Sequence, residues 1–390
     1  MIGQFCLDLH IVTGVYGGGV DPGKSDQNDP FRVPSIRGHL RFWWRALYGD
    51  HDTHEKLKKA EDLRWGSTDK HSAITIEVLA SNPGQGFDIG RTETYTGDDG
   101  KQHTKFTSIL QPAYVLFPGM PKTGKPESFQ LYKNGSFRLR LTVPIPYASE
   151  LENVLKAWIY FGGIGARTRR GCGALFCSNL PKMQPPRDGA FQDVGSATME
   201  RDWTVYRNSR LIIGPKQPTQ QAWERAIEDY RKYRQDRFPP TRGKYGRSRW
   251  PEPDAIRKIR QIPGIPWAHN RPVTIEDEFP RSQFGLPIVF HFKSDPKGRP
   301  DPQDNTLRIN SELDRFASPL ILKPLACSVT EAYPIALALN TPEPPMELTL
   351  RQKDDKSTDR IVYAGPENSI SDFLKKFEEN LKPHARRVTL

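Results

Sequence analysis

The sequence predicts an α+β fold, and for its first half a ferredoxin-like domain with the order β-α-β-β-α-β. Strand-like segments with alternating apolar side chains come before and after two amphipathic helices in that half. The chain has 390 residues, about twice the length of an ordinary domain. A polar segment rich in Pro, Gly and Ser, 181–202, separates the two halves. We therefore expect one domain at 1–185 and a second at 200–390.

The first half carries the elements of this domain in order. Residues 4–15 alternate apolar and polar side chains and are predicted as a strand. A helix is predicted to begin with Ser35 as its N-cap and to end near residue 49. The remaining elements are a short helix at 55–63, strands at 73–80, 113–117 and 137–145, a helix at 149–161 and a strand at 174–180.

The second half is again mixed α and β, with longer insertions and no strict internal repeat of the first. It is predicted to open with a strand at 203–213 and a helix at 219–237, and a loop rich in Pro and Arg follows at 238–253. The later elements are a short helix at 254–261, strands at 283–292, 319–328 and 332–339, and a helix at 369–381.

The charge balance indicates a polyanionic partner. The chain has 57 Lys and Arg against 46 Asp and Glu, and its formal net charge is +11. The excess is localised: 231–260 holds eleven Lys or Arg and three acids, a net charge of +8. Clustered basic charge is the electrostatic signature of a nucleic-acid-binding surface.

Other protein classes are disfavoured by composition. No stretch approaches the roughly 20 apolar residues of a membrane span, and Asp8 interrupts the apolar N-terminal run, so we expect a cytoplasmic protein without a membrane partner. Four cysteines at positions 6, 172, 177 and 327 form neither a disulfide framework nor a zinc pattern. We expect no cofactor and no metal.

A phosphate-binding loop pattern occurs near the N-terminus, at Gly18-x4-Gly23-Lys24-Ser25. Nucleotide binding would require a helix that opens at Gly23 and Lys24. The next nine residues contain two prolines and two aspartates, which favour a loop. We interpret the segment as a loop over bound RNA, with Lys24 as a contact.

The predicted helix after this loop carries a row of arginines. Arg37, Arg41 and Arg45 are spaced four apart, and no acid lies within the helix. Like charges at this spacing repel one another. They could be solvated surface residues, but a phosphate backbone would compensate the charge, and we favour RNA contact.

A glycine-rich loop follows the second long helix. Residues 162–173 contain five glycines, among them Gly162, Gly163 and Gly165. The same loop holds Arg167, Arg169 and Arg170, whose planar guanidinium groups suit phosphates. Glycine allows positive φ and close approach to a ligand. A simple turn needs less of both residue types, so we predict RNA binding here.

A basic segment in the second half interleaves charge with aromatic residues. Arg247 and Arg249 lie between Tyr245 and Trp250, a composition that suits single-stranded nucleic acid. A disordered loop or a surface that docks on a protein explains the composition equally well. We include both arginines among the RNA-binding candidates.

Catalytic patterns are weak. His51 and His54 flank Asp52, but two histidines do not complete a metal site, and a solvated turn is the simpler interpretation. His39 is the only candidate for a general base near the glycine-rich loop, and it has no obvious acid partner. We therefore expect no enzyme.

Two stretches resemble one family closely: 34–45, with its arginine row and paired Trp43-Trp44, and 162–171. The family is the large tandem-RAMP subunit of the type III-B, or Cmr, CRISPR effector. Supporting stretches in the second half are Ser248-Arg249-Trp250-Pro251, Phe284-Gly285-Leu286-Pro287 and Arg315-Phe316-Ala317-Ser318-Pro319-Leu320.

The resemblance implies two ferredoxin-like, RRM-related RAMP domains. It also implies a non-catalytic role in antiviral defence: contact with the 3′ part of the crRNA and with captured target RNA, next to another RAMP subunit. The unusually basic insertion 232–250 departs from the family pattern. Two alternatives stay open: a RAMP-type endoribonuclease that processes CRISPR RNA with His39 as general base, and an architectural subunit that touches no RNA.

Overall fold

The computed structural model describes residues 1–17, 29–49, 51, 53–96, 100, 102–108, 111–116, 130–180, 202–239, 246–262, 277–292, 301–310, 315–365 and 368–390. The chain forms two compact units. Unit 1 contains 1–229, 321–340 and 377–390, and unit 2 contains 230–320 and 341–376. Each unit is therefore assembled from separate segments of the sequence.

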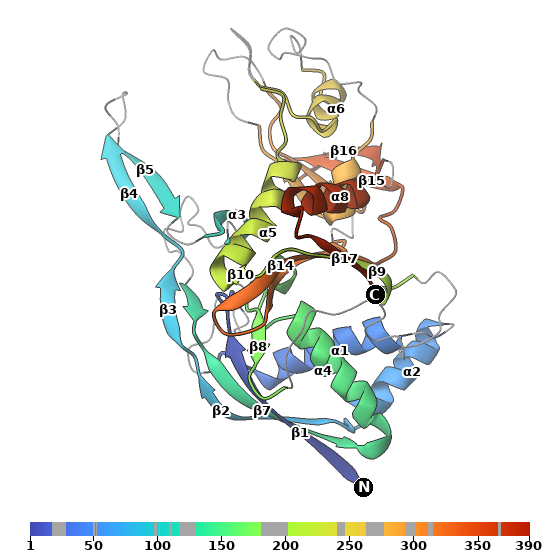
Figure 1. Ribbon diagram of the computed structural model, residues 1–390. Helices are drawn as coiled ribbons and strands as arrows, with labels where there is room; N and C mark the ends of the chain where they lie inside the picture. The colour runs from blue at the N-terminus through green and yellow to red at the C-terminus, as the bar shows by residue number, and fades with distance from the viewer. Residues whose placement is uncertain are drawn as a thin grey trace. The chain divides into compact units, whose positions relative to one another are not determined.

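The first sheet of unit 1 is four-stranded, with the order β2-β7-β1-β8. Its described pairs are antiparallel, with β1 and β7 at the centre. Long helices follow the first strand and precede the last (Figure 1). The elements are β1 (Ile2–Ile11), α1 (Val33–Tyr48), α2 (His54–Trp65), β2 (Thr75–Asn82), β7 (Ser136–Pro144), α4 (Ala148–Phe161) and β8 (Leu175–Cys177), with a 3-10 turn at Ile145–Tyr147 before α4.

The second sheet of unit 1 repeats this order of elements. Its path is β10-β14-β9-β17, and β13 pairs with β14 on the other side from β9. A strand, a helix, a strand pair, a helix and a last strand again follow in sequence. They are β9 (Val205–Ile213), α5 (Thr219–Arg234), β13 (Leu320–Ala326), β14 (Glu331–Asn340), α8 (Ser369–Leu381) and β17 (Arg386–Thr389), with the short β10 (Gln217–Pro218) before α5.

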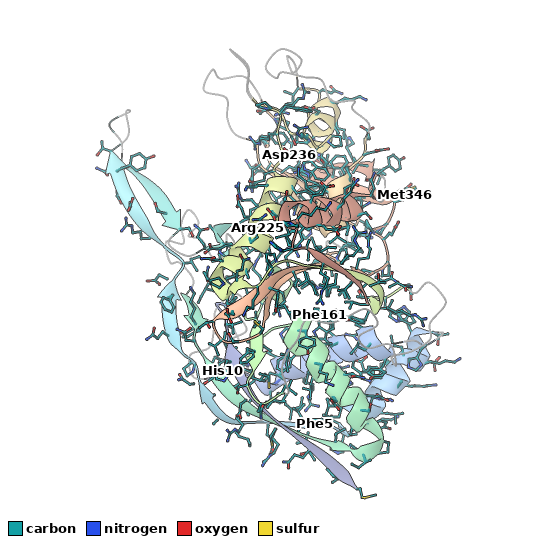
Figure 2. The ribbon with its side chains drawn as sticks, in the orientation of Figure 1. Phe5, His10, Phe161, Arg225, Asp236 and Met346 are labelled. Carbon is teal, nitrogen blue, oxygen red and sulfur yellow. The ribbon has the colours of Figure 1, made fainter. Side chains whose placement is uncertain are left out.

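One hydrophobic core joins both sheets of unit 1 through α1 and α4. Leu7 and Leu139 reach it from the first sheet, and Leu211 and Leu337 reach it from the second. Phe161, labelled in Figure 2, lies between the indole of Trp43 and the ring of Tyr206, with ring centroids 5.9 Å away in each case. Because α1 packs against more than one neighbour, Trp43 and Trp44 are both buried.

Unit 2 consists largely of the two segments inserted into the second set of elements. Its sheet has the order β11-β12-β15-β16, and α6 (Glu252–Ile259) packs on one face of that sheet through Ala255 and Ile256. The strands are β11 (Ile288–Phe290), β12 (Asn305–Arg308), β15 (Glu347–Gln352) and β16 (Asp355–Tyr363), with a 3-10 turn at Pro280–Phe284.

Two antiparallel ribbons are inserted between β2 and β7. β3 (Gln85–Asp88) pairs with β6 (Gln130–Lys133), and β4 (Gly90–Thr96) pairs with β5 (Gln102–Ser108). In Figure 1 the β4–β5 ribbon projects away from the first sheet. These four strands are not predicted from the sequence.

Several predicted elements are confirmed and others are wrong. The α+β class is confirmed, as are both long helices of the first half. The strand expected at 113–117 is wrong: α3 (Ala113–Leu116) is one helical turn after Pro112, because a short apolar run does not distinguish strand from helix. Ser35 is not the N-cap: α1 begins two residues earlier, with Pro34 in its first turn.

The strand expected at 283–292 is much shorter than predicted. Its first two residues end the 3-10 turn Pro280–Phe284, and only β11 (Ile288–Phe290) is a strand. No helix among the described residues is long and apolar enough to span a membrane. The division into domains 1–185 and 200–390 stays a prediction.

Candidate nucleic-acid interface

The glycine-rich loop, defined as residues 162–173, connects α4 to β8. Gly162 ends α4 by donating its N–H to the Trp158 carbonyl. Gly165, Gly171 and Gly173 all have positive φ. A Cβ on Gly173 would lie 2.0 Å from the Ile164 carbonyl oxygen, so only glycine fits. The backbone conformation of the loop therefore itself requires glycine at these positions.

The three arginines of the loop lie on one tight turn. Arg167 adopts the left-handed conformation, with φ 59°, and precedes a 3-10 turn formed by Thr168–Arg170. The Arg169 guanidinium lies over the Phe42 ring of α1, 5.2 Å from its centroid. Burial lowers the pKa of Arg169 to about 10 and also lowers the pKa of Arg167. Arg169 is still cationic at neutral pH, so the turn holds partly desolvated positive charge.

The arginine row of α1 is partly compensated by a neighbouring helix. Glu61 of α2 accepts a hydrogen bond from Arg41 at 2.7 Å and lies 3.8 Å from Arg45. Arg37 donates to the Trp65 carbonyl at 3.3 Å. The row has no acid within its own helix, as the sequence indicates, but Glu61 of α2 neutralises part of its charge. RNA contact by these three arginines stays a prediction.

The arginine row and the glycine-rich loop are adjacent. The His39 ring of α1 is hydrogen-bonded to the Gly165 backbone, and burial lowers its pKa. The contact between Phe42 and Arg169 makes a second link between the two elements. Residues that are about 130 positions apart in the sequence therefore form one basic region.

The basic segment of the second half is largely used inside unit 2. Arg247 is buried and forms a 2.6 Å ion pair with Asp254. Arg249 pairs with Asp236 at 3.3 Å and stacks on the Phe238 ring. The local excess of charge therefore overstates the charge available to a ligand. Arg247 is not placed to meet a polyanion, and we leave it out of the proposed interface.

The other candidate residues are Lys24 of the N-terminal loop and the histidine pair His51 and His54. Lys24 and the rest of the 18–28 loop lie outside the described residues. His54 pairs with Asp202 at 2.7 Å and packs against Trp203, so its partner is not the nearby His51. Within the described ranges, no group of three or more His, Cys, Asp or Glu could hold a metal ion.

The first sheet carries self-paired charges. Arg138 pairs with Asp8 at 2.6 Å, and Arg140 pairs with Glu77. Each pair joins neighbouring strands, since Asp8 is opposite Arg138 in the β1–β7 register. Arg138 and Arg140 on this sheet therefore each have an acidic partner on a neighbouring strand.

Comparisons with known proteins identify sequence relatives of part of the chain. Residues 8–176 match the RAMP superfamily. Two relatives from Pyrococcus furiosus are CRISPR system Cmr subunits: Cmr1-1 is 28% identical over 149 residues, and Cmr1-2 is 27% identical over 192 residues. These matches cover 37% and 45% of this chain. They span 39% of Cmr1-1, about two-fifths of its length, and 96% of Cmr1-2.

The fold is shared with a solved structure of similar size. The crystal structure of apo Cmr1 from Pyrococcus furiosus matches with a TM-score of 0.50 at 14% sequence identity. The match covers 99% of this chain and 98% of that chain.

Proposed function

We propose that this chain, whose residues 8–176 match the RAMP superfamily, is a non-catalytic RNA-binding subunit of a type III-B CRISPR effector complex. Its ligands would be the 3′ part of the crRNA and the captured target RNA. Its protein partners would be neighbouring RAMP subunits, in the cytoplasm. Support comes from the similarity to Cmr subunits and from the basic region on the first half.

The proposal includes two tandem ferredoxin-like domains, at 1–185 and 200–390. The two sheets of unit 1 have equivalent orders, β2-β7-β1-β8 and β13-β14-β9-β17, each with one helix after the first strand and one before the last. This is the β-α-β-β-α-β pattern repeated. The insertions of the second domain would then account for most of unit 2.

The observation that carries the RNA-binding proposal is the turn with Arg167, Arg169 and Arg170. Burial lowers the pKa of two of these arginines, which means that their charged forms are disfavoured by desolvation. A phosphate group would supply charge and hydrogen-bond acceptors to such guanidinium groups. Contacts with phosphate bind nucleic acid without reading its sequence, as a subunit that holds many different guides requires.

The endoribonuclease alternative depends on His39. Its ring faces the Gly165 backbone, and burial holds its pKa below the ordinary value. A general base needs access to the proton it removes, and no observation on His39 favours that role. We therefore retain the non-catalytic proposal.

The test is RNA binding by the purified protein. Fluorescent single-stranded RNA is titrated with wild type and with a variant that changes Arg167, Arg169 and Arg170 to Ala. We expect the Kd to rise at least tenfold, because each charge-assisted hydrogen bond contributes about 1.5–3 kcal/mol. Gel analysis of the same samples should find the RNA intact.

A matched control removes the same charge elsewhere. Arg91, Arg138 and Arg360 are exposed and lie on three different strands, so their triple Ala variant should bind RNA nearly as well as wild type. Equal loss of affinity in both variants would mean that only net charge matters. Discrete RNA fragments that disappear in a His39→Ala variant would instead support the endoribonuclease.

A further inference from the structure

The backbone carbonyls at both ends of the glycine-rich loop accept hydrogen bonds from buried side chains. At the first end, Trp158 Nε1 donates to the Gly163 carbonyl at 2.9 Å. At the second end, Thr13 Oγ1 donates to the Gly171 carbonyl at 2.6 Å and accepts from the Ala174 N–H at 2.8 Å. These two donors come from the first half of the chain.

The second half supplies another donor at the first end of the loop. Lys323 in β13 is fully buried, and its Nζ donates to the Gly162 carbonyl at 2.6 Å. All seven residues of this strand are buried. Burial lowers the pKa of Lys323 to about 7, so the strand carries an amine that a hydrocarbon environment disfavours in its charged form.

The second half also holds the other end of the loop. Trp223 Nε1 in α5 donates to the Arg170 carbonyl at 2.8 Å. The Trp223 ring is packed against Gly171: a Cβ added at Gly171 would lie 2.6 Å from Nε1. The backbone carbonyl of Arg170, the last arginine of the turn, is therefore held by a hydrogen bond from the second half of the chain.

We propose that Lys323 and Trp223 are positioning residues for RNA binding: they hold the two ends of the glycine-rich loop so that its arginines present a fixed set of donors to phosphate. The inference rests on the proposed function and extends it. The second domain would then contribute to RNA binding through hydrogen bonds to the loop of the first domain.

A purely structural role would not explain the choice of lysine. A buried amine costs desolvation energy, and replacing buried charges with apolar side chains of similar volume is often neutral or stabilising. Leu322 and Leu325 show that apolar side chains are accommodated on this strand. A lysine that donates to a loop carbonyl adds a hydrogen bond that an apolar residue cannot supply.

The experiment separates positioning from folding. Lys323→Met removes the donor and keeps the length of the side chain, and Trp223→Phe removes the N–H and keeps an aromatic ring. RNA Kd and Tm are measured for both variants and for Lys59→Met, a control that removes an exposed charge on α2. We expect each loop variant to bind RNA roughly tenfold more weakly, with the Tm of Lys323→Met unchanged or raised.

The outcomes distinguish the inference from the proposed function. If wild type binds RNA and both folded variants bind equally well, the positioning role is wrong and the RNA-binding proposal survives. If wild type itself does not bind, the proposed function fails. If Lys323→Met does not fold, Trp223→Phe decides: retained Tm with weaker binding supports positioning, and retained Tm with unchanged binding overturns it.

Discussion

Single residues carry interactions that their sequence neighbours do not reveal. Glu61 and Lys323 are the clearest examples: one neutralises part of an arginine row, and the other supports a glycine-rich loop that is 161 positions away. Arg247 is a third, because its ion pair with Asp254 makes it an internal group. The identity of a basic residue therefore does not say whether its charge is available to a ligand.

Lys323 should make stability depend on pH. Its pKa in the folded protein is about 7, below the ordinary 10.5, so between these values the unfolded chain binds a proton that the folded protein lacks. Stability contributed at this residue therefore rises with pH across that window. From about pH 7 to about pH 9, wild type should gain about 2 kcal/mol relative to Lys323→Met.

Urea unfolding of both proteins across this range, followed by tryptophan fluorescence, measures that difference. Taking the difference removes titrations that the two proteins share. A difference that does not change with pH would mean that Lys323 keeps an ordinary pKa in the folded protein.

At the scale of elements, regular helices are predicted from the sequence more reliably than those strands that lack a long apolar pattern. The helix that became α1 was expected from its apolar spacing, and the same pattern identified the row Arg37, Arg41 and Arg45. The glycine-rich loop was found because its composition is unusual. The β3–β6 and β4–β5 ribbons were not predicted. Residues such as Gly90–Thr96 are mostly exposed and lack an alternating apolar face. Pairing between α1 and α2 depends on tertiary packing, which no local pattern specifies.

The pairing of α1 with α2 gives a test of the arginine row. If Arg41 and Arg45 contact RNA, Glu61 competes with the phosphates for them. Glu61→Gln should therefore tighten RNA binding by about threefold, the order of energy that one partly exposed ion pair contributes. Binding is measured by fluorescence anisotropy at low salt.

Glu55→Gln is the matched control, because Glu55 lies on the same helix and pairs with the exposed Lys59. It also removes one acidic charge, so equal tightening in both variants would show a general charge effect. Weaker or unchanged binding by Glu61→Gln would mean that Arg41 and Arg45 serve the α1–α2 packing.

At the scale of the whole molecule, the two units are discontinuous in sequence. Large insertions in the second half are predicted from the sequence, but the sheet that their strands share is not. The reason is physical: β12 ends at Arg308 and its partner β15 begins only at Glu347, and neither strand specifies its partner locally. The net charge of +11 is also divided between internal ion pairs and the surface, so its total does not measure the interface.

The number of phosphates bound by the whole molecule follows from salt dependence. For single strands, the logarithm of the binding constant falls with the logarithm of salt concentration with a slope of about −0.7 per phosphate contacted. If only Arg167, Arg169 and Arg170 bind phosphates, the slope should be about −2, and it should approach zero in their triple Ala variant. If the α1 arginines also contribute, wild type should have a slope of about −4 and the variant about −2.

Titrations of both proteins at several salt concentrations therefore count the contacts of each element separately. A wild-type slope near zero would exclude a phosphate-based interface and favour the architectural alternative. A steep slope that is unaltered in the variant would place the contacts on other basic residues, among which the α1 row and Arg249 would be tested next.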